Sequence, residues 1–306
     1  MTPDKYTIQE LMLDVGDSHQ LYIHDWGNKK AKTPVIYFHG GPGSSVDDRA
    51  KRSFDPTIQR VIFYDQRGCG KSTPYGSLEH NTTADLVDDI VQILDHAGAK
   101  QAVLFGGSWG STLALAFALA HPSRVKAMCI RGIFTSGQSE LDWIEKGLYR
   151  VFYPEVWDQL LEHTPEKHRA NAVAYHYKQA LHGATPADRA ASALALEETE
   201  GHLLNMDDRH APLDPTNFDP TSARIEAHYL SNKCFLEPSY ILSNAHKLKM
   251  PVHLVQGRYD MVCPPITAYQ LHATLPNSRL YWTISNHRMD HEIENIVRAI
   301  LLELGQ

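Results

Sequence analysis

The stretch FGGSWGSTLAL, residues 105–115, limits what this chain can fold into more than any other part of the sequence. It contains the pattern G-x-S-x-G, formed by Gly106, Ser108 and Gly110, between an apolar run typical of a strand and an Ala- and Leu-rich run typical of a helix. A strand that turns this sharply into a helix leaves no room for side chains beside the serine, so both flanking positions are glycine. We interpret Ser108 as a nucleophile lifted clear of a sheet, rather than as part of a plain glycine-rich turn.

Short apolar runs alternate with amphipathic runs along most of the chain. Apolar runs rich in β-branched or aromatic residues are typical of strands buried on both faces of a parallel sheet. The predicted strands cover 7–15, 20–26, 33–40, 60–68, 101–107, 125–134, 251–260 and 278–285, and the predicted helices cover 81–99, 111–122, 267–276 and 291–305. This alternation predicts right-handed βαβ units and an α/β fold with a mostly parallel central sheet flanked by helices.

The segment 135–245 breaks the alternation after the sixth predicted strand. It is rich in Ala, His, Glu and Asp and has few strand-like runs, so we predict a mainly helical cap above the sheet. Its most irregular part, 210–226, contains three prolines that indicate loops. The predicted domains are therefore a core formed by 1–134 and 246–306, and a cap formed by 135–245.

Composition and charge exclude several classes of function. The 306 residues are 42% hydrophobic and 21% charged, which is enough apolar material for a large core. The formal net charge is -7 and no basic run occurs, so we expect no binding to nucleic acid, whose phosphates require clustered Lys and Arg. No apolar run approaches the roughly 18–20 residues of a membrane-spanning helix, and the N-terminus does not resemble a signal peptide. The four cysteines form no C-x-x-C pair, so we expect reduced thiols in a soluble cytoplasmic protein without a membrane partner.

A serine hydroxyl needs help to act as a nucleophile. It requires a base, an orienting acid and hydrogen-bond donors for the oxyanion that forms. The stretch FHGGPGSS, residues 38–45, follows the third predicted strand, and Gly41 can offer a backbone N–H there. Trp109, directly after Ser108, can offer a second N–H. The alternative for the glycine-rich stretch is a tight Gly-Pro turn without a catalytic role.

The acid and the base are expected after later strands. Asp260 ends the strand-like stretch VHLVQGRYD and suits the acid, although an aspartate that only caps the next helix is the alternative. His287 directly follows the last predicted strand and suits the base, whereas His291 begins the final helix and is expected at the surface. The two histidines have the spacing of helical zinc ligands, but Arg288 stands where the zinc-protease pattern requires Glu. We therefore predict no metal and no cofactor.

Several motifs together resemble a known family. HGGPG, YDQRGCGKS, GGSWGSTLAL, RGIF and GRYDMVCP are similar to the prolyl aminopeptidases (proline iminopeptidases), serine peptidases of the α/β-hydrolase fold. The likeness covers about 35–135 and 250–290. It implies an α/β-hydrolase fold and a serine hydrolase that releases N-terminal proline, or a similar small residue, through an acyl-enzyme. The implied partner is a small peptide or aminoacyl amide with a free N-terminus.

The resemblance also implies how a substrate is held. ARIEAHYLSNKCF, residues 223–235, is similar to the family's cap segment, in which an acidic residue binds the free α-amino group, and Glu226 matches that position. A second family glutamate follows a Trp-rich stretch. Here ALALEETEG offers Glu197, with Glu198 and Glu200 nearby, and leucines replace the tryptophans.

Two residues near the end of the sixth predicted strand complete the implied site. Arg131 in RGIF matches a family residue that helps to order the acidic cluster, and Phe134 matches one that lines the apolar proline pocket. Cys263 falls near that pocket. The sequence departs from the family where Asn286 replaces the glycine before His287.

Two alternative functions remain open from the sequence. The altered ALALEETEG stretch is compatible with an amidase or esterase that uses the same triad on other acyl compounds. A scaffold that binds a ligand without catalysis is the third interpretation, and the presence of every triad and oxyanion element argues against it.

Overall fold

The structure is a computed structural model that describes residues 4–204, 206 and 210–305. Its strands are β1 (Thr7–Gly16), β2 (His19–Gly27), β3 (Val35–Phe38), β4 (Arg60–Tyr64), β5 (Ala102–Ser108), β6 (Val125–Ile133), β7 (Val252–Gly257) and β8 (Ser278–Thr283). In the described part of the chain they form one eight-stranded sheet in the order β1-β2-β4-β3-β5-β6-β7-β8. β2 pairs antiparallel with β1 and β4, and the other neighbours pair parallel. This is the predicted fold class.

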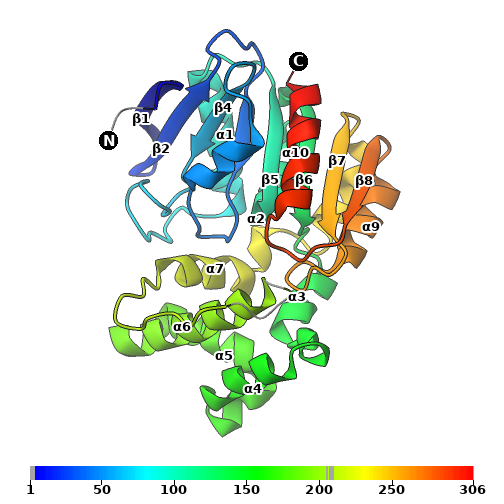
Figure 1. The fold of residues 1–306 in the computed structure, drawn as a ribbon. Helices are drawn as coiled ribbons and strands as arrows, with labels where there is room; N and C mark the ends of the chain where they lie inside the picture. The colour runs from blue at the N-terminus through cyan, green and yellow to red at the C-terminus, as the bar shows by residue number, and fades with distance from the viewer. Residues whose placement is uncertain (1–3, 205, 207–209, 306) are drawn as a thin grey trace.

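Helices cover both faces of the sheet (Figure 1). Those outside the predicted cap are α1 (Thr83–His96), α2 (Trp109–Ala120), α9 (Pro265–Thr274) and α10 (His291–Leu304). Along β5, Val103 and Phe105 pack in one apolar cluster with α10, while Leu104 packs in another with α1 and α2. Successive strand residues point to opposite faces, so a strand covered on both sides reads as a continuous apolar run.

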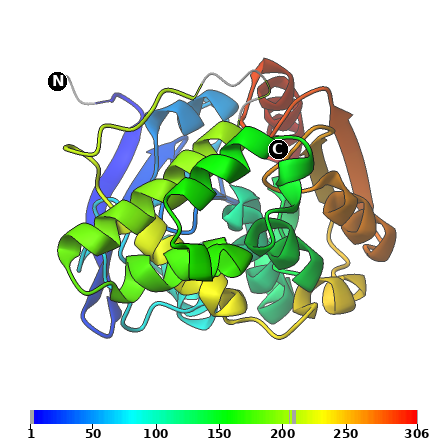
Figure 2. The same ribbon diagram turned by 90° about the horizontal axis from the view of Figure 1, so that it is seen from below.

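The segment between β6 and β7, predicted as the cap, is helical. It contains α3 (Gln138–Glu145), α4 (Pro154–Glu162), α5 (Ala172–His182), α6 (Pro186–Leu203), α7 (Thr221–Ser231) and α8 (Tyr240–Asn244). The 3-10 helices of the chain are η1 (Asp48–Ser53), η2 (Pro122–Arg124), η3 (Leu148–Val151), η4 (Glu166–Asn171), η5 (Lys233–Phe235) and η6 (Ala245–Lys247). Helices α4 to α7 lie beyond the end of the sheet at which β5 passes into α2, and Figure 2 shows them in front of it.

Neither disulfides nor membrane helices contribute to the fold of the described residues. The cysteines of the described residues are buried and free. None of the helices in the described ranges has the length and apolarity that a membrane crossing requires.

The predicted strand 60–68 is shorter in the structure and ends at Tyr64, because Asp65 turns its carboxylate to the backbone. Asp65 accepts hydrogen bonds from the N–H groups of Val46 and Lys71, each at 2.8 Å. A Cβ atom at Gly70 would lie 2.2 Å from the same carboxylate, so only glycine fits there. The motif DQRGCGKS is therefore a loop that holds the segment after β3 in place.

An ion pair between Arg67 and Asp89 joins this loop to α1. Arg67 donates to Asp89 from Nε at 2.8 Å and from Nη2 at 2.7 Å, and donates from Nη1 to the His80 carbonyl at 2.7 Å. The side chains are 3% and 0% exposed. Burial raises the pKa of Asp89 to about 6, although its bonds to Arg67 act in the opposite direction. Such a pair costs desolvation energy, and removing one partner leaves the other charge buried alone.

Arg67→Met is expected to lower the free energy of unfolding by about 3–5 kcal/mol, because it leaves the Asp89 carboxylate without its partner. Urea denaturation at pH 7 measures this change. Arg49→Met is the control, since the side chain of Arg49 is 78% exposed in its ion pair with Asp47 and should matter little. Equal losses in the two variants would contradict the interpretation.

Candidate active site

Ser108 lies in a sharp turn between β5 and α2. Its backbone has φ 56° and ψ -130°, a conformation that residues other than glycine adopt rarely. A Cβ atom at Gly106 would lie 2.5 Å from the carbonyl oxygen of Gly110, and one at Gly110 would lie 2.4 Å from the carbonyl oxygen of Phe38. The two glycines of G-x-S-x-G are thus required by direct backbone contact.

Asp260 and His287 form a hydrogen-bonded pair after β7 and β8. His287 Nδ1 donates to Asp260 Oδ2 at 2.8 Å, and the two residues are 5% and 1% exposed. Gln256 Nε2 also donates to Oδ2 at 3.1 Å, while Oδ1 accepts from the N–H groups of Val262 at 3.0 Å and Cys263 at 2.7 Å. These donors hold the carboxylate in one position, from which it can orient the imidazole so that Nε2 accepts a proton.

The sheet register brings this pair towards Ser108. Ser108 pairs with Ile133 on β6, and the preceding residue, Gly132, packs against the His287 ring. A Cβ atom at Gly132 would lie 2.9 Å from His287 Cε1 and 3.6 Å from Asp260 Oδ2. The three residues interpreted as nucleophile, acid and base therefore lie at the carboxyl ends of β5, β7 and β8, at the same edge of the sheet.

The loop that carries Gly41 lies beside Ser108. A Cβ atom at Gly40 would be 3.5 Å from Ser108 Cβ. Gly41 itself has φ 106°, and a Cβ atom there would lie 2.6 Å from the Gly43 nitrogen. The contact at Gly40 is an ordinary one, whereas a side chain at Gly41 would crowd the loop, so position 41 requires glycine.

Gln66 joins the two segments that carry the expected oxyanion donors. Its Oε1 accepts from the buried Trp109 indole at 2.8 Å, its Nε2 donates to the His39 carbonyl at 3.0 Å, and its N–H donates to His39 Nε2 at 3.0 Å. The motif YDQRG contains this residue, although nothing in its spacing indicates the role.

A small cavity of about 70 Å³ lies over Ser108, between the sheet and the cap. A cavity needs a volume of about 10–15 Å³ to hold one water molecule, so this space suits a small group rather than a long peptide chain. The walls are mostly apolar, and they include Phe134 and Cys263 from the core and Tyr177, Leu196 and Leu230 from the cap. Phe134, which the resemblance assigns to a proline pocket, is thus one of the residues that line the cavity over Ser108.

Two cap glutamates make the cavity acidic on one side. Glu200 of α6 and Glu226 of α7 line it, and their carboxyl groups are hydrogen-bonded to each other. Burial raises the pKa of both, and the charge of Glu200 raises the pKa of Glu226 further, well above its usual value. Two carboxylates this close share a proton rather than ionise together.

Glu197, the residue that the sequence favours for the second glutamate, lies outside the cavity lining. Burial raises the pKa of Glu197 to about 7, and its side chain is hydrogen-bonded to Ser222. The lining residues of α6 are Leu196, Thr199, Glu200 and Leu203, one stripe with spacings of three and four. Glu197 follows Leu196 and is therefore rotated about 100° from it around the helix.

Arg131 lies beneath the loop of His287. Its Nη1 donates to the His287 carbonyl at 2.7 Å, and a Cβ atom at Gly107 would lie 2.4 Å from its Nε. The contact with the His287 carbonyl differs from the role that the resemblance implies, which is to order the acidic cluster.

Comparisons with known proteins agree with this geometry. A family model described as alpha/beta hydrolase fold matches residues 33–291. A proline iminopeptidase of Arabidopsis thaliana is 38% identical over 273 residues, which are 88% of this chain and 72% of that protein. A proline iminopeptidase of Xylella fastidiosa is 37% identical over 298 residues, 96% of this chain and 95% of that protein. The chain belongs to the proline iminopeptidase family of α/β-hydrolases.

A solved structure supports the fold of this family member. The α/β-hydrolase MGS-M2, from a deep-sea metagenome library, matches with a TM-score of 0.70 over 97% of this chain and 98% of its own, at 18% identity. An identity this low supports the fold alone.

Asn286, which replaces a family glycine, is a polar residue whose role no sequence pattern indicates. Its Nδ2 donates to the Leu203 carbonyl of α6 at 2.9 Å, while its Oδ1 accepts from the N–H groups of His287 at 2.7 Å and Met261 at 3.2 Å. One 5% exposed side chain thus joins the cap to the loops of Asp260 and His287.

Tyr149 is a second residue without a sequence signal. It lines the cavity, and among the described residues its buried hydroxyl has no hydrogen-bond partner. A polar group inside the cavity could satisfy it.

Asn286→Ala is expected to slow the labelling of Ser108 by a fluorophosphonate about 10–100-fold, because the His287 loop loses its acceptor and a small misplacement weakens the base. The pH midpoint of labelling should move as well, which a mere loss of stability would not cause. Asn232→Ala removes a similar surface bond to the His228 carbonyl and serves as control. Wild-type labelling in Asn286→Ala would refute the positioning role.

Proposed function

We propose that this chain is a serine aminopeptidase that releases N-terminal proline, or a similar small residue, from short peptides. Relatives named proline iminopeptidase, at 36–39% identity over most of the chain, support the proposal. The observation that carries it is the Glu200–Glu226 pair, which lines the same small cavity as Ser108.

In the proposed reaction, Ser108 Oγ attacks the carbonyl carbon of the first peptide bond while His287 Nε2 takes the hydroxyl proton. The N–H groups of Gly41 and Trp109 bind the oxyanion of the tetrahedral intermediate. His287 then gives the proton to the leaving amine, and the C–N bond breaks to leave an ester on Ser108. Water, deprotonated by the same imidazole, then attacks the ester, and His287 returns that proton to Ser108 Oγ as the C–O bond breaks and the amino acid leaves. Asp260 orients the imidazole throughout.

The acidic side of the cavity supports recognition of a free N-terminus. A glutamate pair that shares one proton carries one net negative charge, which matches one substrate ammonium group. Charge-assisted hydrogen bonds to that ammonium contribute about 1.5–3 kcal/mol. The apolar walls and the small volume suit one proline-sized residue. A substrate with an acylated amine loses the charge and adds bulk beside the glutamates.

Ser108→Ala is expected to reduce the release of proline from a chromogenic proline amide by about a thousandfold or more, because no other nucleophile is proposed. The wild-type enzyme should also fail on the same amide with an acetylated amine. Initial rates at equal enzyme concentration measure both effects. Equal turnover of free and acetylated substrates would instead favour the amidase or esterase alternative.

Glu200→Gln and Glu226→Gln are each expected to lower kcat/KM for the free-amine substrate about 10–100-fold, since a neutral amide replaces part of the charge that binds the ammonium. Hydrolysis of an activated acetyl ester, which has no amine, is the internal control and should change little. Glu200→Gln should lower kcat/KM for the free-amine substrate more than Glu197→Gln does, because Glu200 lines the cavity and Glu197 does not. A larger loss in Glu197→Gln would instead assign the binding of the ammonium group to Glu197.

A further inference from the structure

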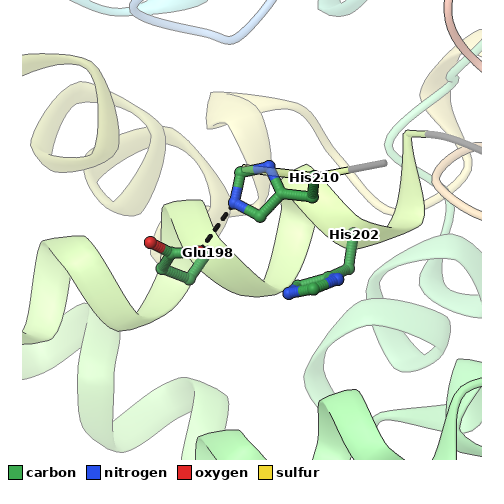
Figure 3. Close-up of side chains that lie close together, drawn as sticks. All are labelled: Glu198, His202 and His210. Carbon is green, nitrogen blue, oxygen red and sulfur yellow. Dashed lines mark hydrogen bonds and ion pairs between the residues drawn. The ribbon is translucent and has the colours of Figure 1, made fainter. Parts of the chain in front are cut away.

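A cluster of three possible metal ligands lies on α6 and the segment that follows it. Glu198 and His202 stand four residues apart on the helix, so they share one of its faces. His210, from the segment after the helix, lies beside the same face, and Figure 3 shows the three side chains together. One ligand atom from each residue lies within 4.8 Å of the other two. The cluster is separate from the His287 and His291 pair considered in the sequence.

His210 packs closely against the helix. A Cβ atom at Gly201 would lie 2.3 Å from His210 Cε1, so the imidazole packs directly on the glycine backbone. The rings of His202 and His210 meet at 65° with their centroids 4.8 Å apart. A side chain at position 201 would push His210 away from this face.

The carboxylate is oriented by a bond outside the cluster. Glu198 Oε1 accepts the N–H of Leu213 at 2.5 Å, which leaves Oε2 directed at His210 Nε2, 2.6 Å away. The side chains of His210 and Glu198 are 12% and 27% exposed. The cluster is therefore sheltered and still reachable from solvent, and a hydrogen bond that fixes a ligand's orientation is typical of metal sites.

We propose that Glu198, His202 and His210 bind one divalent metal ion of the zinc type. Two imidazole nitrogens and one carboxylate oxygen, with water in the fourth position, suit zinc, whereas calcium and magnesium prefer oxygen ligands alone. Zinc holds such ligands at about 2.0–2.2 Å, so ligand atoms stand at most about 4 Å apart. The ion would replace the His210–Glu198 hydrogen bond, so these two ligand atoms would move apart from 2.6 Å, while any separation near the 4.8 Å limit of the cluster would shorten.

The metal would act on the cap rather than on the reacting atoms. Glu200 stands between Glu198 and His202 in the sequence of α6. The Leu203 carbonyl at the end of this helix accepts the hydrogen bond from Asn286. An ion that ties His202 to His210 would fasten this end of α6, and with it the acidic wall of the cavity, to the following segment. The proposal does not depend on the substrate of the enzyme.

The test is calorimetric titration of the EDTA-treated full-length protein with zinc chloride. We expect one equivalent bound in the wild type, and binding at least tenfold weaker in His202→Gln and in His210→Gln. His246→Gln, at an exposed histidine on η6, should bind like the wild type. Zinc should also raise the unfolding midpoint of the wild type more than that of His202→Gln.

Absence of zinc binding in the wild type, or unchanged affinity in both ligand variants, would overturn the proposal. Cobalt titration of the wild type gives an answer even if the variants fail to fold. Four-coordinate cobalt absorbs strongly in the visible range, and this spectrum is expected at one equivalent. A weak spectrum typical of six-coordinate cobalt would count against the site.

Discussion

Backbone packed directly against backbone at the turn after β5 is the constraint on which the site depends. Gly106 and Gly110 contact each other across the turn, and Gly110 also contacts the end of β3. This packing holds Ser108 in a backbone conformation that an unconstrained residue would rarely adopt. It also sets the serine against the loop that begins at His39, so the nucleophile and its expected oxyanion donors are positioned by one contact surface.

Buried polar side chains then secure the loops around that turn. Asp260 accepts four hydrogen bonds, Gln66 joins the loop after β3 to Trp109, and Asn286 and Arg131 hold the backbone of His287. A buried polar group without a partner is costly, so a fully bonded network permits few alternative arrangements. The strand ends bring these residues close, and the hydrogen bonds select their orientation.

The cap adds acidic groups to a cavity whose other lining residues are apolar or uncharged. Placing Glu200 and Glu226 together out of water is unfavourable, as the raised pKa of each carboxyl shows. A ligand with an ammonium group relieves that cost, whereas a neutral ligand does not. In the proposed function, the same buried acidic pair that is costly for the cap therefore provides the selectivity for a free amine.

The sequence alone determined the fold class, the turn at Ser108 and the positions after β7 and β8 from which Asp260 and His287 project, because these follow from short-range patterns. Glycine spacing, strand-like runs and their order along the chain are local properties. The tertiary structure alone decided that Glu200 rather than Glu197 lines the cavity, since the choice depends on how α6 is rotated against the core. It likewise decided that Asn286 joins the cap to the His287 loop and that His210 returns to Glu198 and His202. These contacts join residues far apart in the chain or select one face of a helix, and no local pattern specifies either.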